Sequence, residues 1–179
     1  MTDEVESERF RVRMQAMNVG AVLMLTILAV QFVLGIDVNL FGAFPTTSVV
    51  LQALYSNVDP VLTAHMAVAF LLLVLGVLLA VLGFRRPLPR RVSWAALSGA
   101  LAVFWAFESG IEFVLSGFSN NVASFSMALG FLASVAIYGY LGLVSALSGR
   151  SRFVSILVGG GSLQVAASGS AGPSTQGKR

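Results

Sequence analysis

Four long apolar runs restrict the folds open to this chain. They cover residues 17–36, 60–84, 92–117 and 122–147. An α-helix rises about 1.5 Å per residue, so a run of roughly twenty residues crosses the ~30 Å hydrocarbon core of a bilayer. Backbone groups in lipid must be hydrogen-bonded internally, and a continuous apolar run does this as a helix. We therefore predict an all-α membrane protein, built as a four-transmembrane-helix bundle.

The composition agrees with membrane insertion and excludes several classes of protein. The chain has 179 residues, of which 56% are apolar and 11% are charged. Soluble domains carry about 25% charged residues. The net charge of +3 would suggest nucleic acid in a soluble protein, but the basic residues here flank apolar runs. The sequence thus predicts a lipid bilayer and no nucleic acid as partner. The absence of cysteine excludes disulfides, thiolate metal sites and cysteine nucleophiles.

The basic residues are divided unevenly between the two sides of the predicted bundle. All eleven precede the first run, separate the second from the third, or follow the fourth: Arg9, Arg11, Arg13, Arg85, Arg86, Arg90, Arg91, Arg150, Arg152, Lys178 and Arg179. The other two connections contain no Lys or Arg, only Asp37 and Asp59. By the positive-inside rule, both termini are expected in the cytoplasm. We expect the cytoplasmic membrane of a prokaryote, and call the opposite side the outer side.

The sequence also predicts the structure of three segments outside the spans. In the cytoplasmic segment 1–16, acidic residues precede basic ones, so the helix is expected to begin before it enters lipid. In the outer connection 37–59, a short helix is expected after Pro45, lying either on the membrane surface or over the bundle mouth. The segment 148–179 is expected to be a cytoplasmic Gly/Ser-rich tail, disordered from residue 159 onward.

Small residues recur every fourth position on the last two spans. They are Ser98, Ala102, Ala106 and Gly110 on the third, and Ser126, Gly130 and Ser134 on the fourth. Small side chains let helix backbones approach closely, which drives helix association in lipid. A short turn over 118–121 makes these two spans antiparallel neighbours, so we expect the stripes to face each other within one chain. A homodimer seam is the alternative.

Polar side chains fall at one depth in the outer half of the membrane. His65 lies five residues inside the second span, comparable positions on the other spans hold Gln31, Glu112 and Ser126, and Glu108 lies one turn deeper than Glu112. Carboxylates within a membrane are costly, so they usually face the bundle interior and pair. Glu108 and Glu112 are four residues apart and share a helix face. We therefore predict an intramembrane polar cluster of these five residues.

Three interpretations of this cluster stay open. It can be a hydrogen-bonded plug that fixes helix packing, or a proton or cation site. It can also hold a divalent metal, since His65, Glu108 and Glu112 form a two-carboxylate, one-imidazole ligand set. Haem is the other candidate cofactor for this cluster. Because the chain has one histidine, a bis-His haem within one chain is excluded. His65 with Met24 or Met127, or two His65 side chains across a dimer, would remain, whereas Met66 points about 100° away from His65 and cannot bind the opposite side of the same iron.

Motifs of conventional enzymes are absent from the sequence, including GxSxG, HExxH, the P-loop and GxGxxG. We therefore lean against an enzyme. The expected function is a non-enzymatic subunit or accessory of a membrane complex, as a homodimer or in a larger assembly. The alternative is a small redox, metal, haem or proton-handling protein that uses the outer-half His/Glu cluster.

Several short motifs are shared with a known type of protein. They are Asn39-Leu40-Phe41, His65 at the opening of a Leu/Val/Gly-rich span, Asn121, Ser126-Met127-Ala128 and Tyr138. In this order, with a proline-containing outer loop, the chain resembles small four-span prokaryotic integral membrane proteins of unassigned function. The resemblance covers roughly residues 20–145. It implies the same topology and no particular activity.

Overall fold

A computed structural model describes residues 2–41, 60–85 and 88–168. These residues form four helices and no strand: α1 (Thr2–Phe41), α3 (Pro60–Gly83), α4 (Arg90–Leu115) and α5 (Asn121–Ser168). Each helix contains a stretch long and apolar enough to cross a membrane. The all-α prediction with four apolar helices is therefore confirmed, and it fits a multi-pass membrane protein. The helix expected after Pro45 lies outside the described residues.

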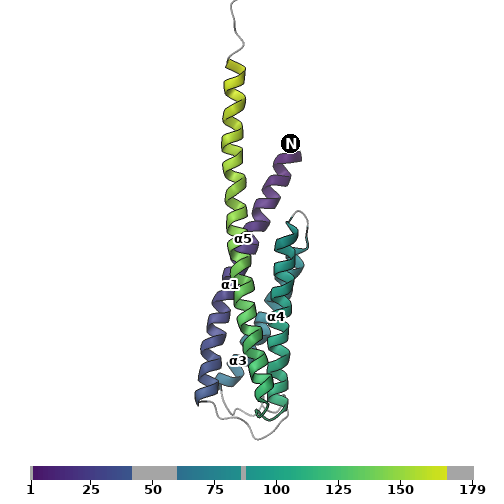
Figure 1. The fold of residues 1–179 in the computed structure, drawn as a ribbon, viewed down its shortest axis with the longest axis vertical. Helices are drawn as coiled ribbons and strands as arrows, with labels where there is room; N and C mark the ends of the chain where they lie inside the picture. The colour runs from purple at the N-terminus through teal and green to yellow at the C-terminus, as the bar shows by residue number, and fades with distance from the viewer. Residues whose placement is uncertain (1, 42–59, 86–87, 169–179) are drawn as a thin grey trace, which may run out of the picture.

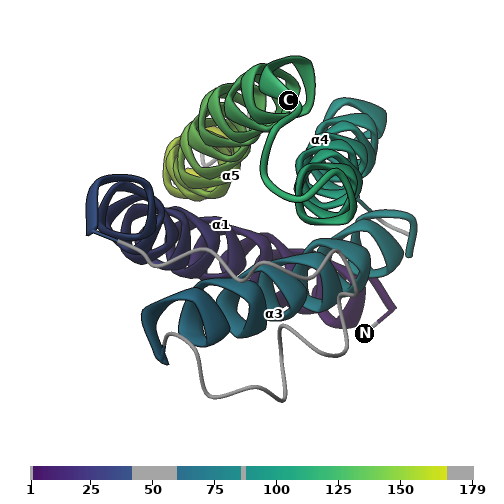
Figure 2. The same ribbon diagram turned by 90° about the horizontal axis from the view of Figure 1, so that it is seen from below.

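The helices form a ring in which each contacts its neighbours along the chain, and α1 closes the ring against α5 (Figures 1 and 2). We call the end where α1 and α4 finish and α3 and α5 begin the loop end. The opposite end, which carries Arg9 to Arg13 of α1 and Arg90 and Arg91 of α4, is the arginine end. Figure 1 shows α1 and α5 extending beyond the other two helices at the arginine end.

The helices begin and end at residues with the expected local chemistry. Pro60 opens α3, where its missing N–H costs no hydrogen bond. In the turn between α4 and α5, Gly117 has a φ of 66°, which a residue without Cβ adopts freely. The side-chain oxygen Oδ1 of Asn120 then accepts hydrogen bonds from the backbone N–H groups of Val122 and Ala123, which caps the start of α5. This tight turn makes α4 and α5 antiparallel neighbours.

Two helices are longer than their apolar runs. The helix α1 begins at Thr2, in agreement with the expectation that it starts before the apolar segment. The helix α5 continues to Ser168, so the expectation of disorder from residue 159 is wrong as far as that residue. A formed helix gains one hydrogen bond for each residue it adds, while an interior glycine costs only about 1 kcal/mol. Composition alone therefore underestimated the length of this helix.

The core lies between the middle of the bundle and the arginine end. Met14, Met17 and Met24 of α1 are almost completely buried and belong to one cluster with residues of the other three helices. Methionine is flexible and fills irregular gaps between helices. Most of the large aliphatic side chains are exposed instead, as lipid allows. The five residues of the predicted polar cluster lie outside this core, closer to the loop end.

Candidate functional site

One pair from the predicted cluster is formed, and it joins α1 to α3. The Nε2 atoms of Gln31 and His65 lie 3.2 Å apart, at hydrogen-bond distance. The Gln31 side chain is buried, with 9% exposure. One turn further along α1, a Cβ placed on Gly35 would lie only 3.2 Å from Cε1 of His65. The glycine therefore gives the imidazole room to lie against α1.

This pair leaves hydrogen-bonding capacity unused. Among the described residues, His65 Nδ1 and Gln31 Oε1 are buried without a partner. If the Gln31 amide donates to Nε2, the neutral ring carries its proton on Nδ1. If the amide is turned over, Oε1 accepts from Nε2–H and the amide nitrogen is unpaired. In either orientation, one nitrogen of the imidazole ring and one atom of the amide group remain available for a further hydrogen bond.

Ser126 lies in a different contact, between α4 and α5. Its hydroxyl accepts a hydrogen bond from the indole N–H of Trp105 at 2.9 Å and another from the Ser109 hydroxyl at 3.2 Å. Interhelical hydrogen bonds of this kind hold membrane helices in register. Ser126 therefore fixes helix packing, and the sequence analysis did not identify either of its two partners.

The two carboxylates do not turn inward. Glu112 is exposed, and its Oε1 accepts a hydrogen bond from Nδ2 of Asn120 at 2.9 Å, which ties the end of α4 to the following turn. Glu108 is also exposed and has no hydrogen bond or ion pair with any described residue. Its neighbour Ser109, about 100° around the helix, is buried instead. The helix α4 is thus rotated so that both carboxylates face away from the bundle.

The predicted metal ligands are consequently dispersed. No group of three His, Asp or Glu side chains placed to hold a metal ion occurs within residues 2–41, 60–85 and 88–168. Met127 packs in the α4–α5 contact, where its Sδ lies 3.4 Å from a Cβ placed on Gly110. His65 instead lies against Gln31 and Gly35 of α1. The structure therefore brings together Gln31 and His65, and leaves Glu108, Glu112 and Met127 elsewhere.

The two stripes of small residues meet between α4 and α5. A Cβ placed on Gly130 would lie 2.9 Å from the backbone nitrogen of Ala106, so the helices touch at backbone level. Ser134 is buried and donates a hydrogen bond to the Gly130 carbonyl. Ala102 is buried as well, but Ser98 is exposed. Positions four apart drift by about 40° per step on a helix of 3.6 residues per turn, so the stripe leaves the contact before reaching Ser98.

Tyr138 is a central residue that the sequence analysis did not single out for packing. It has 0% exposure and extends from α5 between α3 and α4. A Cβ placed on Gly99 would lie 2.8 Å from the ring, and one placed on Gly76 would lie 3.2 Å from the hydroxyl. The hydroxyl has no partner among the described residues. Its position, four residues after Ser134 on the same stripe, was the signal that could have identified it.

The outward face of α4 is the second feature relevant to function. Its residues are all exposed and follow one another at alternating spacings of four and three: Trp94, Ser98, Leu101, Trp105, Glu108, Glu112 and Leu115. We call these seven residues the α4 outer face. It carries two carboxylates on a helix that is apolar enough to span a membrane.

The Gln31–His65 pair and the α4 outer face are therefore the two arrangements from which a function can be inferred. Comparison with protein-family models, with curated proteins and with solved structures found no match to this chain.

Proposed function

We propose that this protein is a non-enzymatic subunit or accessory of a membrane complex, and that the α4 outer face is its contact with a partner helix. The observation that carries this proposal is Glu108. Its carboxylate is exposed on an apolar helix and has no partner among the described residues. Intramembrane carboxylates almost always face protein rather than lipid.

The depth of Glu108 makes its exposure costly. It precedes Leu115, the last residue of α4, by seven positions, which corresponds to about 10 Å along the helix axis. An ionised carboxylate at the centre of a spanning helix costs about 2.5–3.5 kcal/mol, and less nearer the ends. A partner helix that offers a hydrogen-bond donor at this depth removes much of that cost. Glu108 therefore destabilises the isolated chain in lipid and favours its association with a partner helix.

The spacing of the face suits a helix as the partner. Alternating steps of three and four residues keep one face of a helix in contact with a second helix in a left-handed pair. Most transmembrane bundles pack with this geometry, at crossing angles near +20°. Ser98 is small enough to allow close approach, while Trp105 and Leu101 offer apolar contact area. The face is therefore built from residues that suit a helix–helix interface.

A pair of exposed leucines provides a matched test. Leu101 lies on the α4 outer face and Leu132 on α5, with exposures of 58% and 61%. A photo-crosslinking residue at each position would be activated in native membranes. We expect protein adducts from position 101 and none from position 132. In native nanodiscs, the assembly should exceed the 18.8 kDa of one chain, and Glu108→Leu should reduce it. A monomer without adducts from position 101 would refute the proposal.

A second candidate function rests on the Gln31–His65 pair. Its unpartnered ring nitrogen and amide atom suit a proton or cation site, or a metal or haem ligand. Gentle purification, followed by an absorption spectrum and a metal analysis, tests whether the pair binds a cofactor. A Soret band or stoichiometric metal that disappears with His65→Ala would support it, and a colourless, metal-free protein would exclude it. Proton-coupled flux that is lost with His65→Ala would instead support the proton site.

The orientation in a prokaryotic cytoplasmic membrane, with both termini inside, is also part of the proposal. The distribution of Lys and Arg supports it, because all eleven lie before the apolar run of α1, between the apolar runs of α3 and α4, or after the apolar run of α5. The chain has no cysteine, so single cysteines can be introduced freely. An impermeant maleimide should label Gly117→Cys on intact cells and leave Arg90→Cys unlabelled. The reverse pattern would contradict the proposed orientation.

A further inference from the structure

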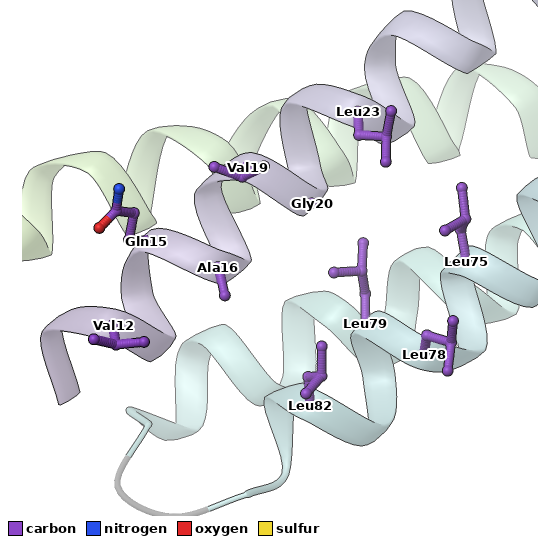
Figure 3. A pocket seen from close by; sticks show the side chains of 10 residues that line it. All are labelled: Val12, Gln15, Ala16, Val19, Gly20, Leu23, Leu75, Leu78, Leu79 and Leu82. Atoms are coloured by element: carbon purple, nitrogen blue, oxygen red, sulfur yellow. The ribbon is translucent and has the colours of Figure 1, made fainter. Parts of the chain in front are cut away.

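An apolar groove of about 480 Å³ runs along the outside of the bundle between α1 and α3 (Figure 3). Ala16 of α1 and Leu79 and Leu82 of α3 point toward one another across it. Gln15 is the one polar residue among those that line it. The groove lies on a different side of the molecule from the α4 outer face, so an occupant here is independent of the partner proposed above.

Glycine and alanine create this groove. A Cβ placed on Gly20 would clash with the side chain of Leu79, so α1 and α3 approach closely at that point. Toward the arginine end, Ala16 is too small to fill the space beside Leu82. The groove is thus held open between two packed helices, and a flexible apolar chain fits its shape.

Arginines lie beyond the groove, at the arginine end of the bundle. Residues seven apart lie on nearly the same face of a helix, about 10 Å apart along its axis. Arg9 precedes Ala16 by seven residues, and Arg13 precedes Gly20 by the same interval. The groove therefore has an apolar floor and, beyond one end, two guanidinium groups on α1.

The α3 side of the groove leads to a third arginine. Arg85 lies two residues beyond Gly83, the last residue of α3, and its backbone N–H donates a hydrogen bond to the Leu82 carbonyl, so it stays beside the end of α3. Glu8, seven residues before Gln15, is the acid at the corresponding level. Glu6 lies seven residues before Arg13 on the same face, so three arginines and two glutamates leave a net charge of +1 around this end of the groove.

We propose that the groove and these arginines form a binding site for one anionic phospholipid. One acyl chain lies in the groove, and the phosphate is held by Arg9, Arg13 and Arg85. Arg13 already has a buried donor, Nη1, without a partner among the described residues. Arginine suits this role because its planar donors match phosphate oxygens. A partner helix would fill the groove with apolar side chains and leave the arginines without an anion.

The headgroup determines selectivity at this site. An acyl chain is in apolar surroundings both in the bilayer and in the groove, so its burial favours no particular lipid. Each arginine near an anionic membrane surface contributes roughly fivefold in affinity. We therefore expect the full chain to bind phosphatidylglycerol more tightly than phosphatidylcholine with the same acyl chains, with a stoichiometry of one.

Native mass spectrometry of the purified full chain, titrated with these two lipids in detergent, tests the proposal with matched variants. Ala16→Phe fills the groove, and Ala136→Phe, on an exposed position of α5, is its control. Arg13→Gln removes a proposed phosphate ligand, and Arg11→Gln removes an exposed arginine two residues away that points elsewhere on α1. Circular dichroism would verify that each variant is helical.

We expect Ala16→Phe to abolish the single bound lipid and Ala136→Phe to leave it. Arg13→Gln should lower the preference for phosphatidylglycerol roughly fivefold, with little change in Arg11→Gln. Equal losses in the two arginine variants would show a diffuse attraction and overturn the proposal. Retention of the lipid by Ala16→Phe would also overturn it, as would a second protein chain in place of the lipid.

Discussion

Replacing Gly130 with alanine tests the closest helix contact in the bundle. The added Cβ would lie 2.9 Å from the backbone nitrogen of Ala106 and 3.0 Å from its Cα and Cβ. Ordinary contacts of a Cβ begin near 3.4 Å. The neighbouring atoms belong mainly to backbone, which cannot rotate away as a long side chain can. The helices α4 and α5 would therefore have to separate by roughly half an ångström along their contact, a form of overpacking.

The expected magnitude follows from two opposing effects. Overpacking of a well-packed contact costs about 1–3 kcal/mol. Replacing glycine by alanine inside a helix gains about 0.5–1 kcal/mol. Gly139, on the same helix, is the matched control because a Cβ placed there meets nothing within 4 Å. Gly139→Ala should therefore show the gain alone. We expect Gly130→Ala to be less stable than Gly139→Ala by about 1–3 kcal/mol.

The assay is reversible unfolding of the purified chain in mixed detergent micelles, which gives a free energy of unfolding for each variant. A second substitution, Gly130→Leu, should destabilise further because its side chain meets the same backbone. If Gly130→Ala and Gly139→Ala have equal free energies of unfolding, α4 and α5 do not touch at backbone level. The close contact described between Gly130 and Ala106 would then be refuted.

Two further predictions use the same assay. A double-mutant cycle of Gln31→Ala and His65→Ala should give a coupling of about 0.6–1.7 kcal/mol, because these side chains share one interhelical hydrogen bond; no coupling would show that they do not interact. Tyr138→Phe should leave the free energy of unfolding unchanged or raise it by up to about 1 kcal/mol, because its buried hydroxyl has no partner among the described residues. The exposed Tyr140, replaced by Phe, is the control, and a clear loss of stability in Tyr138→Phe would reveal an acceptor.

Depth along the bundle was predictable from the sequence, whereas rotation about each helix axis was predictable only in part. Apolar run length and the position of the arginines placed Gln31 and His65 at one level, and the structure joins them. The same reasoning placed Glu112 at that level and Glu108 one turn deeper, but could not determine which way either carboxylate faces. A spanning helix is apolar on every side, so the usual distinction between a buried apolar face and an exposed polar face is lost.

The rotation of α4 depends on contacts that are distant in sequence. Gly99 must face the ring of Tyr138, and Ala106 must face Gly130, because larger side chains would not fit there. With those faces fixed, Ser109 points inward and Glu108 points outward. The spacing of small residues predicted the contact between α4 and α5. Predicting that Gly99 lies in the interior would also have required knowing that Tyr138 extends into the centre of the bundle. Such a contact among three helices is not visible in the periodicity of any one helix.

The cost of exposing side chains in lipid explains why α4 is the informative helix. Large apolar residues such as Leu101 and Trp105 lose little by facing lipid, so many of them are exposed while small residues, methionines and Tyr138 share the interior with a few leucines and valines. Exposed apolar residues on α1, α3 and α5 therefore need no partner. Glu108 is different, because lipid offers its carboxylate no hydrogen-bond donor. A partner helix, as proposed above, would remove much of this cost, and the alignment of Glu108 with Leu101 and Trp105 on one helix face supports a helix as the cover.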